Sequence, residues 1–212
     1  LPRTSLVVLE NTANKGGGSY YTLEEIRPIR QLCTERGLKL HLDGARLFNA
    51  LVETGENPQQ VGALFDSISI CLSKGLGAPV GSLLIGDAAF IRQARRVRKA
   101  LGGGMRQAGY LAAAGIYALD HHVMRLKTDN ERARQIGQVL QALPYVATVR
   151  PVQTNIVIFD VQSPYTAATF LEKLAEQGIK AAAFGPQTIR FVTHLDFTDT
   201  MLQQTLEILC KL

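Results

Sequence analysis

The sequence predicts an α/β protein in which a large domain with a mainly parallel sheet precedes a smaller α+β domain. Between residues 6 and 100, short β-favouring runs alternate with longer amphipathic runs. That alternation is typical of βαβ units and of a parallel sheet. From residue 145 onward the expected order is strand, strand, helix, strand, strand, helix. An Ala-rich segment from 105 to about 130 contains few helix breakers. It predicts one long helix that ends the first domain, so we expect domains at 1–128 and 129–212.

Local signals place the elements of the first domain. Thr22 and Glu25 have the spacing of a capping box, which opens a helix that ends at Gly37. Asn57 before a proline starts a short helix, and Asp87 caps a basic helix that ends at three glycines. A further helix covers about 46–52. The expected strands are 6–9, 38–43, 68–72 and 82–85.

The second domain shows similar signals. Ser163 is expected to cap a helix over 164–177, and a last helix runs to the end of the chain. The apolar, β-branched runs between them predict strands over 145–149, 155–161, 179–184 and 188–193.

Composition restricts the class of protein. The chain has 212 residues, of which 46% are hydrophobic and 19% charged, as in ordinary globular proteins. No apolar run approaches the roughly 18 residues of a membrane span, so no membrane association is expected. Cys33, Cys71 and Cys210 are odd in number and far apart, without metal-binding spacing. They favour reduced thiols in the cytoplasm and no metal site.

The net charge of +5 is unevenly distributed. Positive charges gather between residues 92 and 106: Arg92, Arg95, Arg96, Arg98, Lys99 and Arg106. Such a cluster can bind nucleic acid, form a solvated helix face or attract an anionic cofactor. Because no aromatic residues are interleaved with these charges, nucleic acid is the least favoured of the three.

The segment 67–81 is the first candidate for chemistry. A buried strand delivers Lys74 into a turn that contains Gly75, Gly77 and Gly81, where the backbone can approach a ligand closely. Partial burial there would lower the pKa of the amine, as a Schiff-base lysine requires. The alternative is a lysine that merely ends a strand beside a turn.

A second candidate lies about thirty residues upstream. Leu38, Leu40 and Leu42 alternate with polar residues, which predicts a strand that ends at Asp43. In an open α/β sheet, ligands bind at the carboxyl ends of the strands. An aspartate there can pair with the protonated ring nitrogen of pyridoxal phosphate, and Arg46 can reach the same ring. Alternatively, Asp43 only caps the following helix.

Four segments resemble the signature blocks of the low-specificity L-threonine aldolases. They are Leu-Glu-Asn-Thr-Ala-Asn-Lys-Gly-Gly-Gly at 9–18, His-Leu-Asp-Gly-Ala-Arg at 41–46, Leu-Ser-Lys-Gly-Leu-Gly-Ala-Pro-Val-Gly at 72–81 and Lys-Ala-Leu-Gly-Gly-Gly-Met-Arg-Gln at 99–107. The blocks occur in family order. The resemblance implies the fold of fold-type-I enzymes that depend on pyridoxal 5'-phosphate. It also implies cleavage of L-threonine and L-allo-threonine to glycine and an aldehyde, a lyase reaction of amino-acid metabolism and glycine biosynthesis.

The resemblance also implies roles for five residues. Lys74 would carry the cofactor, Asp43 would pair with the pyridine nitrogen, Arg46 would contact the ring oxygen and Arg106 would bind the phosphate. Arg190 lies between apolar neighbours in the second domain and would bind the substrate α-carboxylate in a bidentate manner. A buried salt bridge is the alternative for Arg190, because a charge in such surroundings needs a partner.

His41, His121, His122 and His194 are each expected to be structural. The resemblance places the base for the substrate hydroxyl in a segment outside this sequence, so no base is assigned. Family members are longer, and the additional segment is expected before Leu1, where the family places ring-stacking and phosphate-binding groups. The resemblance implies a homodimer or homotetramer. Alternative functions are another fold-type-I lyase that catalyses β-elimination, or a truncated, non-catalytic α/β fragment.

Overall fold

The computed structural model describes residues 3–212, which form two compact units. The first unit contains residues 3–12 and 20–124, and the second contains 13–19 and 125–212. The division at Met124 and Arg125 lies four residues before the expected domain boundary. The loop 13–19 groups with the second unit although it follows the first strand of the first unit.

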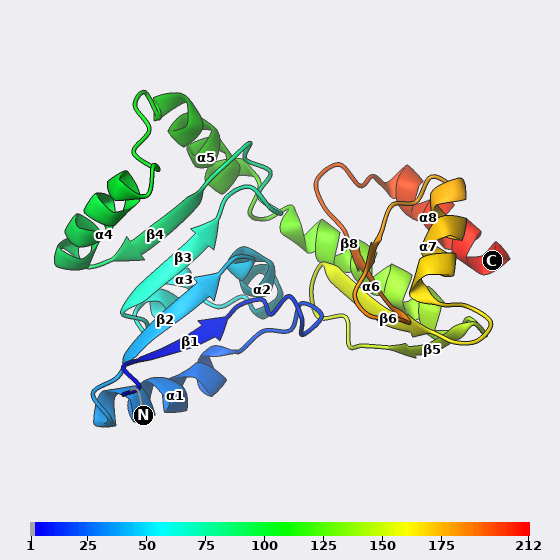
Figure 1. Ribbon diagram of the computed structural model, residues 1–212, viewed down its shortest axis with the longest axis horizontal. Helices are drawn as coiled ribbons and strands as arrows, with labels where there is room; N and C mark the ends of the chain where they lie inside the picture. The colour runs from blue at the N-terminus through cyan, green and yellow to red at the C-terminus, as the bar shows by residue number, and fades with distance from the viewer. Residues whose placement is uncertain (1–2) are drawn as a thin grey trace. The chain divides into compact units, whose positions relative to one another are not determined.

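The first unit is built on a four-stranded sheet in the order β1-β2-β3-β4 (Figure 1). The strands are β1 (Leu6–Glu10), β2 (Lys39–Gly44), β3 (Ser67–Cys71) and β4 (Ser82–Gly86). The pairs β1–β2 and β2–β3 are parallel, whereas β4 runs antiparallel to β3. The expected mainly parallel sheet is therefore confirmed.

Helices of the first unit begin at the expected signals. α1 (Leu23–Glu35) opens with the capping box of Thr22 and Glu25, and Asn57 caps α3 (Pro58–Gly62). The Asp87 side chain accepts a hydrogen bond from the Phe90 backbone at the start of the basic helix α4 (Ala88–Ala100). The remaining two helices are α2 (Leu47–Thr54) and α5 (Gly109–His121). A core of leucine, isoleucine and valine side chains from α1, α2, α3, β2 and β3 packs against one face of the sheet.

The second unit has an antiparallel sheet in the order β5-β6-β8-β7. Its strands are β5 (Val146–Val149), β6 (Ile156–Val161), β7 (Ala182–Ala183) and β8 (Thr188–Val192). Its helices are α6 (Leu126–Gln141), α7 (Ala167–Glu176) and α8 (Asp199–Lys211), which lie on one side of that sheet in Figure 1. Phe159, Phe170 and Leu140 are fully buried in the core between these layers.

Three expected elements differ from the structure. The single helix over 105–130 is wrong, because α5 ends at His121 and α6 begins at Leu126. The sequence has no glycine or proline at this break. His122 instead makes a tertiary contact there, donating from Nδ1 to the main-chain oxygen of Leu76 at 2.6 Å. A single-residue propensity cannot reveal such a contact.

The other two differences concern the second unit. α7 is capped by Thr166 rather than by Ser163, because Thr166 and Thr169 exchange side-chain and backbone hydrogen bonds. The strand expected over 179–184 contains only the two residues of β7. Lys180 and Ala181 precede it without strand structure.

Candidate active site

The candidate site begins at the carboxyl edge of the three parallel strands. Asp43 of β2 lies in register with Glu10 of β1 and with Ser69 of β3. The loop that contains Lys74 leaves the same end of β3. Parallel strands present their carboxyl ends at one edge, which is where open α/β sheets bind ligands. Adjacent strands therefore deliver the carboxylate and the amine to the same edge.

Asp43 does not act as a helix cap. The N-cap of α2 is Arg46, which makes no side-chain capping bond. The Asp43 Oδ1 atom accepts a hydrogen bond from the Ala45 backbone at 3.2 Å, and the Asp43 main-chain oxygen accepts one from Asn11 at 2.8 Å. The side chain is half-buried. Within residues 3–212 no lysine or arginine pairs with it. A half-buried carboxylate that has no lysine or arginine partner can form an ion pair with a cationic group of a ligand.

Lys74 lies in a closed loop after β3. Main-chain bonds from Leu72 to Gly81, from Gly77 to Lys74 and from Ala78 to Leu72 hold the loop at 2.9–3.0 Å. Gly77 and Gly81 have φ values of 72° and 120°, a region that favours glycine. The expected partial burial of Lys74 is not found, because its side chain is exposed in this structure. The other face of the loop is fixed by the buried Leu72 and Leu76.

One histidine supports the Lys74 loop, and a second joins two strands at the other end of the sheet. His122 holds the main-chain oxygen of Leu76, two residues beyond Lys74. The His41 Nδ1 and the Ser67 Oγ lie 2.8 Å apart across β2 and β3. Both contacts are structural, because one holds the loop after β3 and the other joins β2 to β3.

Charge stabilises the opposite end of the same strands. Asp66, just before β3, accepts hydrogen bonds from the Leu40 backbone at 2.8 Å and from Arg30 and Lys39 at 2.6 and 3.0 Å. Burial alone would raise the pKa of this carboxyl, but these hydrogen bonds outweigh burial and lower the pKa to about 2. Asp66 therefore joins β2, α1 and the start of β3 as an anion.

The structure places the two remaining cationic candidates of the first unit differently. Arg46 is half-buried at the start of α2, and its backbone donates to the Asn11 oxygen at 3.4 Å. Arg106 is exposed in the segment between α4 and α5. Among the described residues, no hydrogen bond or ion pair joins Arg106 to Asp43 or Lys74. The structure thus brings Arg46 to the strand edge but does not bring Arg106 into contact with it.

Arg190 forms a separate site within the second unit. It lies half-buried on β8, with Nη1 donating to the Asn14 Oδ1 at 2.7 Å and Cζ 4.9 Å from the centre of the Phe184 ring. No carboxylate of residues 3–212 forms a salt bridge with it, so the alternative of a buried ion pair is not found. Its Nε atom is buried and has no hydrogen-bond partner among these residues. A buried, unsatisfied donor on a guanidinium suits a carboxylate ligand.

The loop 13–19 holds this arginine in place. Arg150 donates to the main-chain oxygen of Lys15 at 2.8 Å, and Thr154 Oγ1 donates to that of Gly18 at 2.7 Å. A Cβ atom at Gly18 would lie 2.4 Å from Thr154 Oγ1, so only glycine fits this close approach. The sequence prediction assigned no role to Asn14. Its place in the block 9–18 is the signal that points to it, but the pairing with a residue 176 positions away is visible only in the fold.

The sequence model of the family described as "Beta-eliminating lyase" matches residues 1–164, more than half of the chain. This chain belongs to the beta-eliminating lyase family. It is 42% identical over 202 residues to a low specificity L-threonine aldolase of Escherichia coli K12. This match covers 95% of this chain and 58% of the relative. It is 38% identical over 208 residues to Low-specificity L-threonine aldolase 1 of Arabidopsis thaliana, with 97% and 58% coverage.

Solved structures of this class share the fold. A protein described as a putative aromatic amino acid beta-eliminating lyase/threonine aldolase of Exiguobacterium superimposes with a TM-score of 0.83 at 27% identity, covering 100% of this chain and 63% of that one. A putative L-allo-threonine aldolase of Listeria monocytogenes gives 0.78 at 22% identity, covering 96% and 60%. The expected fold-type-I architecture and the expected resemblance to threonine aldolases are confirmed. The chain spans about 58% of the length of the two curated relatives.

No helix within residues 3–212 is long and apolar enough to cross a membrane. These residues also contain no cluster of three or more histidine, cysteine, aspartate or glutamate side chains that could hold a metal ion.

Proposed function

We propose that this family member is a pyridoxal-phosphate-dependent aldolase that cleaves L-threonine and L-allo-threonine to glycine and an aldehyde. The observation that carries the proposal is the pair of Asp43 and Lys74 at the carboxyl ends of adjacent parallel strands. The names of the relatives at about 40% identity support the substrate class.

The residues present fit the cofactor. The Asp43 carboxylate is half-buried and has no cationic partner among the described residues, so it can hold a proton on the pyridine nitrogen. Lys74 is exposed beside glycines that leave room for a flat ring, and its amine can attach the cofactor covalently. Arg46 would contact the ring oxygen, and Arg106 the phosphate. When bound, pyridoxal phosphate supplies an electron sink for the carbanion that forms at the substrate Cα.

The substrate would be oriented by Arg190. Its Nε atom is buried and unsatisfied, and Asn14 fixes Nη1, so the guanidinium retains donors for the α-carboxylate. A bidentate grip on that carboxylate sets the direction of the Cα–Cβ bond relative to the ring. We assign no base for the β-hydroxyl proton among the described residues.

Arg106 also supports a proposal on assembly. Three glycines at 102–104 precede it, and its side chain is exposed. We infer a homodimer or homotetramer in which Arg106 reaches the phosphate site of a neighbouring subunit. Mixing a Lys74→Ala protomer with an Arg106→Ala protomer tests this: partial return of activity is expected. No recovery despite proven subunit exchange, or an active monomer, would overturn it.

The cellular setting is part of the same proposal. We infer a cytoplasmic enzyme that supplies glycine in amino-acid metabolism. The three cysteines are free thiols in the structure, and such thiols persist in a reducing compartment.

Product analysis distinguishes the proposed reaction from its alternatives. With L-threonine as substrate, we expect glycine and acetaldehyde in equal amounts. The second candidate, β-elimination by another fold-type-I lyase, is favoured by the family description, and for a serine-like substrate it yields pyruvate. Pyruvate from L-serine without acetaldehyde from L-threonine would establish that candidate instead. A protein that binds pyridoxal phosphate but forms neither product would be the non-catalytic alternative.

A further inference from the structure

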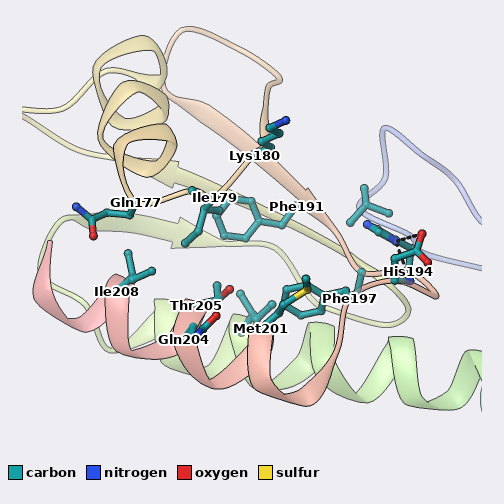
Figure 2. Close-up of a pocket in the computed structure, with 15 residues that line it drawn as sticks. Gln177, Ile179, Lys180, Phe191, His194, Phe197, Met201, Gln204, Thr205 and Ile208 are labelled. Carbon is teal, nitrogen blue, oxygen red and sulfur yellow. Dashed lines mark hydrogen bonds and ion pairs between the residues drawn. The ribbon is translucent and has the colours of Figure 1, made fainter.

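A cavity of about 570 Å³ opens within the second unit (Figure 2). Its walls come from α6, α8, β8 and the segment that follows α7. The apolar lining consists of Ile136, Ile179, Phe191, Phe197, Met201 and Ile208. This volume falls within the roughly 300–1,000 Å³ typical of small-molecule sites. It is far larger than a packing defect in a protein core.

The cavity is separate from the groups that the proposed reaction uses. Arg190 and Phe191 are neighbours on β8, and successive side chains of a strand point to opposite faces. Phe191 packs into the core on the helix side, so Arg190 faces the other side of the sheet. Neither Asp43 nor Lys74 lines the cavity. None of the five residues assigned to the proposed reaction is part of the cavity lining.

One buried polar group borders the cavity. Thr205 on α8 is only 6% exposed as a residue, and it lines the cavity. Figure 2 shows this side chain on the side of α8 that faces Phe191, with no dashed line to any other lining residue. A hydroxyl in the cavity wall can form a hydrogen bond with a ligand oxygen in place of a water molecule.

Charge is confined to the rim. Lys180 extends from the segment after α7, away from the apolar walls in Figure 2. His194 and Asp196 lie at the other end, with Nδ1 and a carboxylate oxygen 3.9 Å apart. The wall between them is apolar except for threonine and glutamine side chains. An ion would lose its hydration inside without gaining a partner, so charged ligands are disfavoured.

We propose that this cavity is a binding site for a small uncharged molecule that has an apolar body and one hydroxyl or carbonyl oxygen. The body packs against Phe191, Ile179 and Ile208, and the oxygen forms a hydrogen bond with the Thr205 hydroxyl. The site does not depend on the proposed aldolase reaction. It would be present in the protein whether or not threonine is cleaved.

Benzyl alcohol and toluene are suitable probes, because they share the apolar ring and differ in the oxygen. The intact protein, with its isoleucine and methionine methyl groups labelled with ¹³C, is titrated with each probe by NMR. Saturable shifts are expected for the methyl groups of Ile179, Ile208 and Met201. Thr205→Val should weaken benzyl alcohol binding roughly three- to tenfold and leave toluene binding unchanged, because only one hydrogen bond is removed.

Matched variants control for charge and folding. Met201→Glu places a charge at the cavity and should abolish binding of both probes, whereas Gln203→Glu puts the same charge on an exposed position of α8 and should have no effect. Thr205→Ser retains the hydroxyl, so it should bind benzyl alcohol in preference to toluene as the wild type does. This variant keeps the test available if Thr205→Val does not fold. Shifts that do not saturate, or equal weakening of both probes in the valine variant, would overturn the proposal.

Discussion

Replacement of Asn14 by alanine should impair substrate binding without impairing cofactor binding. Asn14 accepts a 2.7 Å hydrogen bond from the Arg190 Nη1. In the proposed function this bond fixes the guanidinium plane against β8, so that the remaining donors face the substrate carboxylate. Asn14 is thus a positioning residue, and its effect on activity passes through Arg190.

The size of the effect follows from the type of bond. A hydrogen bond to a charged group contributes about 1.5–3 kcal/mol, and each 1.4 kcal/mol corresponds to a factor of ten. Because Arg190 is half-buried and water can replace part of the lost bond, we expect a loss near the lower end. The predicted decrease in kcat/KM for L-threonine is roughly tenfold, mostly through KM.

A second substitution at the same position gives a sharper test. Asn14→Asp would pair its carboxylate with Arg190 and compete with the substrate, so KM should rise further than in the alanine variant. Lys15→Ala is the matched control, since the exposed Lys15 contributes only its main-chain oxygen to Arg150. Steady-state kinetics and cofactor absorbance give the readouts. Unchanged KM in both Asn14 variants, or lost cofactor binding in either, would refute the positioning role.

Two further predictions concern other charges of the first unit. Asp43→Asn should retain the fold, as measured by circular dichroism. It should lower kcat at least a hundredfold, because an amide cannot stabilise a protonated ring nitrogen. Near-normal turnover would contradict this prediction. Asp66 has its pKa lowered from 3.8 to about 2, so its stabilisation is complete above pH 3.8 and is lost as the pH falls towards 2. Its side chain is 22% exposed. Denaturant unfolding should therefore show that wild type loses about 2 kcal/mol more than Asp66→Asn between pH 6 and pH 2.

The elements that the sequence predicted well are those with local causes. The capping box of Thr22, the Asn57 cap of α3 and the alternation that ends at Asp43 each depend on a few neighbouring residues. Each appears in the structure at the expected place. The parallel order of the first three strands followed from the alternation of strands and helices.

The differences have non-local causes. The break between α5 and α6 coincides with the contact of His122 to Leu76, 46 residues away. Loop 13–19 belongs to the second unit because Arg150 and Thr154 form hydrogen bonds with it. No local sequence pattern links these two residues to the loop. The same holds for the candidate site. Asp43 and Lys74 could be expected at one sheet edge, whereas Asn14 as a partner of Arg190 could not.

The central claim is that Lys74 carries the cofactor. Sodium borohydride reduction of the protein loaded with pyridoxal phosphate, followed by tryptic digestion and mass spectrometry, tests it directly. Residues 47–92 contain no arginine or lysine before Arg92 except Lys74, so modification there leaves one uncut peptide of that span. We predict the phosphopyridoxyl mass on this peptide and its loss in Lys74→Ala. A stable adduct on a different lysine, or a label that persists in Lys74→Ala, would contradict the claim.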